Sequence, residues 1–246
     1  MQSISTIGYM SIKNKKDRFA FVIPVYNHAG TVAQVVKNAQ DMGYPVFVVD
    51  DGSTDATYGQ IKEIADIQIL RHEQNQGKGA AIITGFAAAS NVADWAITID
   101  ADGQHYPEDA RKLIKAIPKK IRPIVVGART GMEGKHVPWT SSFGRKFSNF
   151  WVRTSGGPAI SDSQSGFRIY PLPEAFNLKT KARRFQFEVE ILVQASRDGI
   201  PVIEAPVRVN YNPNGERISH FRPFVDFLRN SSTFSRLIFR RIFSLK

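Results

Sequence analysis

Two aspartates one residue apart, Asp100 and Asp102, directly follow a short apolar segment near the middle of the chain. Gln104 continues the same spacing. Side chains at positions i and i+2 of an extended segment point to the same side, so these three side chains converge. Two carboxylates and an amide offer the oxygen ligands that suit Mg²⁺ or Mn²⁺ shared with a diphosphate. The alternative is a solvated acidic turn that caps the next helix, but the position after a buried strand favours the metal site.

A second acidic pair, Asp50 and Asp51, also follows an apolar segment and precedes Gly52. The glycine permits a tight turn, and Ser53 or Thr54 can cap a following helix. Capping needs only one polar side chain. A remaining carboxylate can therefore accept hydrogen bonds from a nucleobase N–H or a ribose hydroxyl.

Lys78 stands between Gly77 and Gly79 at the start of a predicted helix. Glycines allow close approach of the backbone, and a lysine at a helix N-terminus can meet a phosphate. The segment matches neither the dinucleotide-binding fingerprint nor the phosphate-binding loop of nucleoside triphosphatases. It is a weak signal when taken alone.

Apolar runs and helical patterns alternate through the first half of the chain. The predicted strands are 19–25, 46–49, 67–70, 95–99 and 121–126, and the predicted helices are 31–42, 54–65, 79–89 and one that begins at Pro107. Such alternation predicts an α/β fold with one Rossmann-like, mostly parallel sheet flanked by helices. Ligands bind at the carboxyl ends of the strands in these sheets, where both acidic pairs are expected to lie.

The second half is less regular, with predicted helices at 141–152 and 185–195, a loop at 131–138 and a proline-containing edge strand at 201–209. A basic, aromatic and helical pattern covers 221–245. We expect a flexible lead-in at 1–17, one catalytic domain at 18–215 and a basic amphipathic extension at 216–246.

Composition limits the function classes. The chain has 246 residues, a net charge of +11 and no cysteine, which excludes disulfides, thiolate catalysis and cysteine-ligated zinc. The positive charge favours anionic partners such as nucleic acid, anionic lipid or phosphorylated small molecules. No apolar run approaches the roughly 20 residues of a membrane span, and the N-terminus does not resemble a secretory signal. We therefore expect a cytoplasmic protein.

Six motifs occur in order along residues 19–210: PVYN, VVDDGSTD, NQGKGAA, TIDADGQHYPED, VVGAR and DSQSGFR. Together they resemble family 2 glycosyltransferases of the GT-A fold, in particular dolichol-phosphate mannose synthases and bacterial polyprenyl-phosphate glycosyltransferases. The resemblance implies an inverting, metal-dependent transfer of a sugar from a UDP- or GDP-sugar to a lipid-linked acceptor, with polyprenyl phosphate as the leading candidate.

The resemblance also implies roles for individual residues on the donor side. Tyr26 would lie near the base, Asp51 would bind it and Asp50 would support Asp51. The full set implied to contact the sugar nucleotide is Pro24, Tyr26, Asn27, Asp50, Asp51, Lys78, Asp100, Ala101 and Asp102. Asp100, Asp102 and Gln104 would hold Mg²⁺ or Mn²⁺. His105 is interpreted as solvent-exposed or as lying behind the metal ligands.

Asp102, Arg129, Arg145 and Asp162 are the residues that the resemblance places in catalysis. The two arginines would face the anionic acceptor or the leaving diphosphate. A phosphate acceptor is already ionised and needs only arginines to hold it, whereas a hydroxyl acceptor needs a base. Asp162 is the candidate base, with a carboxylate of the 187–190 segment as the alternative. The alternative without a role in catalysis is that DSQSGFR is only a turn leading into a strand and that Glu188 and Glu190 are ordinary helix acids.

Residues 217–246 combine arginines with apolar side chains at helical spacing. This segment is expected either to lie on the inner face of an anionic membrane or to pack against the domain. Arg217, Ser219 and His220 would close over the diphosphate or belong to a structured basic loop. The competing function classes are a non-catalytic sugar-nucleotide-binding protein and a basic nucleic-acid-binding protein, although no recognised nucleic-acid motif is present. The donor sugar, the acceptor and any homo-oligomer stay open at this level.

Overall fold

The apolar run at the start of the domain forms a fully buried strand, β1 (Phe19–Val25), at the bounds expected from the sequence. The computed structural model describes residues 17–130, 139–210, 231, 233–239 and 242–243. Within this part, β1 lies inside a seven-stranded sheet with the order β3-β2-β1-β4-β6-β5-β7. Burial on both faces explains the continuous apolar sequence of β1.

The sheet is mostly parallel, as predicted. The other strands are β2 (Val46–Asp50), β3 (Gln68–Arg71), β4 (Trp95–Thr98), β5 (Ile124–Arg129), β6 (Arg168–Pro171) and β7 (Val202–Val207). Strand β6 is antiparallel to both of its neighbours, β4 and β5. It therefore begins at the edge of the sheet where the parallel strands end. Strand β7 is an edge strand, which confirms the expectation from its prolines.

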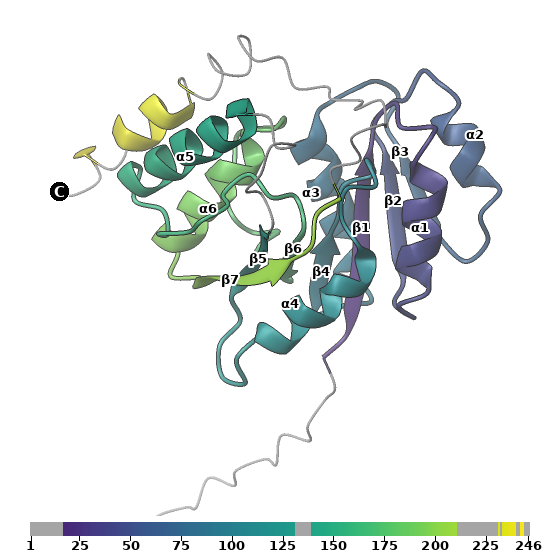
Figure 1. The fold of residues 1–246 in the computed structure, drawn as a ribbon, viewed down its shortest axis with the longest axis horizontal. Coiled ribbons are helices and arrows are strands. Elements are labelled where there is room, and N and C mark those ends of the chain that lie inside the picture. Colours follow the sequence, from purple (N-terminus) through teal and green to yellow (C-terminus); the bar gives the residue numbers. More distant parts are fainter. Residues whose placement is uncertain (1–16, 131–138, 211–230, 232, 240–241, 244–246) are drawn as a thin grey trace, which may run out of the picture.

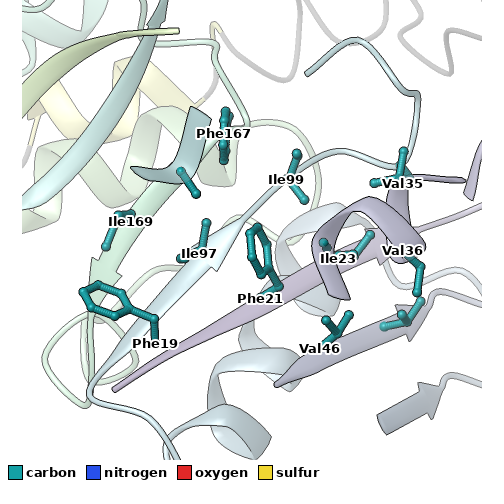
Figure 2. Packing of buried hydrophobic residues seen from close by; sticks show 14 of the residues in the cluster. Phe19, Phe21, Ile23, Val35, Val36, Val46, Ile97, Ile99, Phe167 and Ile169 are labelled. Atoms are coloured by element: carbon teal, nitrogen blue, oxygen red, sulfur yellow. The ribbon is translucent and has the colours of Figure 1, made fainter. Parts of the chain in front are cut away.

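Helices cover both faces of the sheet (Figure 1). They are α1 (Val32–Gln40), α2 (Thr57–Lys62), α3 (Lys78–Ala89), α4 (Ala110–Ala116) after a short 3₁₀ turn (Pro107–Asp109), α5 (Trp139–Thr154) and α6 (Phe187–Arg197). Helices α1 and α4 pack with Phe21, Ile23 and Ile97 on one face. Figure 2 shows these three side chains together with Val35 and Val36 of α1. Helices α3 and α6 pack with Ala20, Val22 and Val126 on the opposite face.

Two predicted elements, the helix at 54–65 and the strand at 121–126, have different bounds in the structure. Helix α2 begins at Thr57, because Thr54 N donates a hydrogen bond to Asn27 Oδ1 (2.8 Å) and Asp55 Oδ1 accepts one from Thr57 N (2.9 Å). Neither Ser53 nor Thr54 therefore caps this helix. Strand β5 starts later than predicted and runs through Arg129, so that arginine belongs to the strand itself.

The C-terminal helical segment 233–239 packs along α5 and α6 (Figure 1). Phe234 and Leu237 are buried there against Val152, Val189 and Val193. In contrast, three side chains of the same segment and its continuation are 61–64% exposed: Phe239, Ile242 and Phe243. Packing against the domain, one of the two expectations for the tail, is thus confirmed for Phe234 and Leu237, whereas contact with a membrane stays a prediction.

Several expectations fall outside the described residues. These are the lead-in at 1–16, the loop at 131–138 and the 211–230 segment with Arg217, Ser219 and His220. Among the helices that the structure describes, none combines the length and the apolar character needed to cross a bilayer.

Candidate active site

One edge of the sheet collects the polar residues singled out in the sequence. Strands β1, β2 and β4 end there, which places Asn27, Asp50 and Asp100 at neighbouring positions. The segment before the antiparallel strand β6 returns the chain to this same edge. The topology therefore brings the motifs from both halves of the chain together.

The PVYN segment and the DDGSTD segment are hydrogen-bonded into one unit. Asn27 has a positive φ of 52°, donates from its N–H to Ser53 Oγ (3.0 Å) and accepts at Oδ1 from Thr54 N. His28 N donates to Thr57 Oγ1 (2.8 Å). Tyr26, which precedes these contacts, is half-buried. This network sets the backbone of the candidate nucleoside pocket.

Asp51 is buried and accepts three hydrogen bonds from the protein. The donors are Gln76 N (2.9 Å), Gly77 N (2.8 Å) and the Nδ1 side of His72 (2.7 Å). Asp51 therefore organises the loop that leads into α3. Its direct contact with a nucleobase stays a prediction, since its oxygens already serve this loop.

Asp50 is also buried and holds its own turn. It accepts from Ser53 N (2.9 Å) and pairs with Arg71 Nε (3.1 Å). The carboxylate thus neutralises an arginine at the end of β3 and fixes the turn around Gly52. Both carboxylates of the acidic pair act on the shape of the pocket.

Gly77 is required by the backbone at this point. Its φ is +104°, and a Cβ there would overlap Arg183 O and the Arg184 side chain. The 182–184 segment therefore lies directly on the N-terminus of α3. Ala80 N reinforces the contact by donating to Arg183 O (3.0 Å).

Lys78 lies between two carboxylates. Its Nζ is 2.6 Å from Asp100 Oδ1 and 2.6 Å from Glu188 Oε1. Burial acts to lower the pKa of Lys78, but the two carboxylates outweigh it and raise that pKa well above its usual value. The same ammonium holds the pKa of Asp100 below its usual range despite burial of that carboxyl. Lys78 is thus a fixed positive charge beside the first aspartate of the pair.

Asp102 has the opposite electrostatic environment. Burial and the negative charge of Asp100 raise the pKa of Asp102, although Gln104 N donates to Asp102 Oδ1 at 3.0 Å. Excess negative charge of this kind is what a divalent cation neutralises. The side chains of Asp100, Asp102 and Gln104 would all offer oxygen atoms as metal ligands, and oxygen ligands fit Mg²⁺ or Mn²⁺. In the part of the chain that the structure describes, no group of three or more His, Cys, Asp or Glu residues is placed to hold a metal ion.

The DSQSGFR segment touches the metal motif. A Cβ at Gly166 would lie 2.5 Å from Asp100 Oδ2, and Gly166 O accepts a hydrogen bond from Thr98 Oγ1 (2.9 Å). Arg168 is fully buried and donates to the carbonyls of Ser163 (2.8 Å), Ser165 (2.6 Å) and Glu188 (2.8 Å). The segment is therefore a turn into strand β6, as one interpretation held, and it also forms a wall of the site.

Gly166→Ala is expected to lower the activity of this site by at least tenfold, because the new methyl group would push the Asp100 carboxylate out of place. A shift of about 1 Å in a catalytic group costs on the order of 100-fold. The measurement is kcat/KM together with the Mn²⁺ concentration that gives half-maximal activity. Gly59→Ala is the matched control, since a Cβ there meets no atom within 4 Å. Equal activities of the two variants would contradict the close contact.

Asp162 and Arg129 form a buried pair next to this wall. Arg129 donates from Nε to Asp162 Oδ2 (2.7 Å), from Nη2 to Asp162 Oδ1 (2.8 Å) and from its backbone N to Oδ2 (3.2 Å). Burial acts to raise the pKa of Asp162, but Arg129, helped by the charge of Arg145, holds it below its usual range. The structure thus groups the three residues of the expected acceptor side, and it makes Asp162 a weak base.

Sequence reasoning missed Glu204 and left two interpretations open for Glu188 and Glu190. Glu204 on β7 accepts hydrogen bonds from Ser161 N (2.8 Å) and Asp162 N (3.1 Å), and an acid within an otherwise apolar strand was the available signal. Glu188 and Glu190 are not ordinary helix acids, because both are buried. Glu188 pairs with Lys78, whereas Glu190 accepts from Lys181 N and Ala182 N.

His105 is not solvent-exposed. It is buried against Phe167, with ring centroids 5.4 Å apart, and burial lowers its pKa to about 4. The imidazole is therefore neutral at pH 7. The first of the two expected positions is therefore wrong, and the second, behind the metal ligands, stays a prediction.

Comparison with known proteins identifies the family. The family model described as "Glycosyl transferase family 2" matches residues 20–175. The chain is a family 2 glycosyltransferase. The matched range runs from the second residue of β1 past the end of β6 and therefore includes every strand end that carries a candidate residue on the donor side.

Two named relatives of this glycosyltransferase illustrate the family. A Methanococcus voltae protein named UDP-N-acetylglucosamine–dolichyl-phosphate N-acetylglucosaminyltransferase is 34% identical over 212 residues, covering 77% of this chain and 84% of the relative. The undecaprenyl-phosphate mannosyltransferase of Micrococcus luteus is 28% identical over 204 residues, covering 77% of this chain and 82% of the relative.

A solved structure confirms the GT-A fold. Glucosyl-3-phosphoglycerate synthase from Mycobacterium tuberculosis, in complex with Mn²⁺, UDP-glucose and phosphoglyceric acid, superimposes with a TM-score of 0.65. The superposition covers 92% of this chain and 80% of that chain, at 19% sequence identity. The resemblance read from the six motifs is thus confirmed for family and fold.

Proposed function

We propose that this glycosyltransferase moves a sugar from a UDP- or GDP-sugar to the phosphate of a polyprenyl lipid at the cytoplasmic face of the membrane. The observation that carries the proposal is the contact between Gly166 and Asp100. It joins the metal motif to the loop that, four residues earlier, holds Asp162 against Arg129. The names of both relatives combine a sugar with a polyprenyl-type phosphate, which supports this acceptor class.

The donor would lie across the carboxyl ends of β1, β2 and β4. Pro24, Tyr26 and Asn27 would line the nucleoside pocket, whose shape Asp50 and Asp51 hold through the contacts described above. Lys78 and Ala101 would lie near the diphosphate. The position of Lys78 at the start of α3 supports this role, because the helix N-terminus and the ammonium both attract negative charge.

Mg²⁺ or Mn²⁺ would be held by Asp100, Asp102 and Gln104, and the complex of the fold neighbour with Mn²⁺ and UDP-glucose supports this choice. When bound, the ion neutralises the charge that develops on the leaving diphosphate. Lys78 adds a permanent positive charge next to Asp100. These groups would make the nucleoside diphosphate a better leaving group.

On the acceptor side, Arg129 and Arg145 would hold the lipid phosphate. A phosphate oxygen attacks the anomeric carbon from the face opposite the diphosphate and forms the new C–O bond. The bond from the anomeric carbon to the β-phosphate oxygen breaks, and the nucleoside diphosphate leaves with the electron pair. The anomeric configuration inverts, and no proton has to be removed because the acceptor is already ionised.

Transfer to a lipid hydroxyl is the alternative, and it would require Asp162 as the base. The depressed pKa of Asp162 and its three hydrogen bonds from Arg129 argue against that role. The phosphate acceptor therefore fits the site better.

The test of the proposal is a transfer assay with radiolabelled UDP- and GDP-sugars in detergent, with polyprenyl phosphate and with polyprenol as acceptors. We expect Mn²⁺- or Mg²⁺-dependent product with the phosphate only. Product with polyprenol that is lost in Asp162→Asn would establish the hydroxyl alternative. Binding of a sugar nucleotide without transfer to either lipid would indicate a non-catalytic protein.

Membrane contact through the exposed apolar residues of the C-terminal segment is part of this proposal. Simultaneous replacement of Phe239, Ile242 and Phe243 by serine is expected to weaken binding to anionic vesicles by at least tenfold. Full burial of one such side chain contributes roughly 1.5–3 kcal/mol. The measurement is co-sedimentation with vesicles, and the matched control replaces three apolar side chains exposed elsewhere, Val92, Ile121 and Phe176. Equal losses in both variants would contradict a directed contact.

Deletion of the whole tail is a poorer test, because the segment also stabilises the domain. Arg236 Nη2 pairs with the buried Glu190 Oε1 (2.7 Å), and Leu237 O accepts a hydrogen bond from Arg197 Nη2 (2.7 Å). Truncation before these residues would leave a buried carboxylate without its arginine, so loss of membrane binding could reflect unfolding. The serine replacements avoid this problem.

A further inference from the structure

A short basic loop lies between β6 and α6. Its cations are Lys179, Lys181, Arg183 and Arg184, which place four positive charges within six residues. All four residues are exposed. In the described part of the chain, no carboxylate forms an ion pair with any of the four side chains. Neither the family motifs nor the site described above accounts for this charge.

The backbone of the basic loop is held rigidly although its side chains are open. Glu190, which is fully buried, accepts hydrogen bonds at Oε2 from Lys181 N (3.0 Å) and Ala182 N (2.6 Å). Arg183 O accepts one from Ala80 N (3.0 Å). The four cations are therefore presented from a fixed backbone, so little backbone order has to be gained on binding a partner.

Glu190 also connects the basic loop to the C-terminal segment. Its other oxygen, Oε1, accepts from Arg236 Nη2 at 2.7 Å. One carboxylate thus binds the loop and the C-terminal helix together. Three residues after Arg236 begins the exposed apolar set of Phe239, Ile242 and Phe243. The backbone of the basic loop and Arg236 of the C-terminal helix thus share one buried carboxylate.

We propose that the basic loop is a second membrane-docking element, which binds the anionic headgroups of the bilayer while the C-terminal segment inserts its apolar side chains. The inference rests on the proposed function, because it places the lipid surface next to the donor site. Basic residues together with exposed apolar side chains are the combination that interfacial segments use. Each lysine or arginine close to an anionic surface strengthens partitioning roughly fivefold.

The basic loop lies next to the candidate active site, so membrane binding by the loop would affect access of the acceptor. The same segment packs on Gly77 at the N-terminus of α3, where Lys78 meets Asp100. A bilayer bound by the loop would lie beside the mouth of the candidate active site. A lipid-linked phosphate could then reach the site without its chain leaving the membrane.

The experiment compares two triple variants of the full chain. The first replaces Lys179, Lys181 and Arg183 by glutamine, leaving Arg184 because it donates to Asn75 Oδ1 (3.1 Å). The matched control replaces Lys115, Lys119 and Lys120 by glutamine, three exposed cations that lie at or beyond the end of α4 and before the start of β5. Partitioning onto vesicles with about one-third anionic lipid is measured at low and high salt, without donor or acceptor. Affinity for UDP- and GDP-sugars and for a single-stranded oligonucleotide is measured in parallel.

We expect the loop variant to partition at least tenfold more weakly than the wild type at low salt, and the control to change less than threefold. High salt should remove most of the difference, since about 10 Å is the screening length at 0.1 M. Unchanged partitioning, or equal loss in the control, would overturn the proposal. A parallel loss of sugar-nucleotide affinity would also overturn the proposal, because the loop would then bind the diphosphate of the donor. A loss of affinity for the oligonucleotide alone would overturn it as well.

Failure of the proposed function gives a different result. Wild-type partitioning that depends on the loop, combined with no transfer to polyprenyl phosphate in detergent, would refute the acceptor and leave the docking surface intact. Transfer in detergent by a loop variant that no longer binds vesicles would support both.

Discussion

Asp102→Asn is expected to lower metal-dependent sugar transfer by about 1,000-fold while the fold stays intact. The substitution keeps the size of the side chain and its hydrogen bond from Gln104 N, but removes the negative charge that a divalent cation would neutralise. Lewis-acid stabilisation of a leaving group contributes several kcal/mol, and 1.4 kcal/mol corresponds to a factor of ten. The elevated pKa of Asp102 indicates that the folded protein carries unbalanced charge there, so its removal should not destabilise the fold.

The measurement is kcat/KM over a range of Mn²⁺ concentrations, with the unfolding temperature as the test of folding. Glu63→Gln is the matched control, because that carboxylate is 76% exposed and its only described partner is the neighbouring Lys62. Wild-type turnover of Asp102→Asn in Mn²⁺ would show that the metal assignment is wrong. Asp100 is a less clear choice, since its loss would also leave Lys78 with Glu188 as its one remaining carboxylate partner.

Arg129→Gln is expected to destabilise the folded protein by about 3 kcal/mol, because it leaves the buried Asp162 carboxylate without its cation. Breaking a buried ion pair by removing one partner costs roughly 3–5 kcal/mol. For a domain of this size the unfolding temperature should fall by roughly 6–12 °C. Arg18→Gln is the control, since the pair of Arg18 with Asp94 is largely exposed and its loss should have a much smaller effect.

The effect of Arg129→Gln should depend on pH. The pKa of Asp162 is lowered in the folded state, so its contribution to stability is present above the pKa of an unfolded aspartate and is lost as the pH falls through the folded value. The difference in unfolding free energy between wild type and variant should therefore be large at pH 7 and smaller near pH 3. A constant difference across this range would show that the ion pair is not its source.

A double-mutant cycle of Arg129→Gln with Asp162→Asn separates the pair from other effects of the substitutions. In the transfer assay, the pH–rate profile of Asp162→Asn should keep the shape of the wild-type profile, since a phosphate acceptor needs no base. If the fall in activity at low pH disappeared in that variant, Asp162 would instead act as a base, because a base works only when it is deprotonated.

The sequence alone determined the fold class and the edge of the sheet where the chemistry lies. Strand β1 occurs at its predicted bounds because a run that is buried on both faces has a clear apolar signature. Asp100 and Asp102 were predicted from local spacing after such a strand, and six ordered motifs were enough for the family. These signals are local in the sequence, so they can be interpreted without knowledge of long-range contacts.

Only the tertiary structure decided what the second half of the chain contributes. Gly166 meets Asp100 because β6 runs antiparallel, and this direction depends on pairing with strands far away in the sequence. Glu188 and Glu190 lie two residues apart on α6, yet one pairs with Lys78 and the other with a loop and the C-terminal helix. Their roles depend on burial and on partners brought by other elements. Charges of buried side chains are set by those partners, and for this reason periodicity and spacing could not assign them.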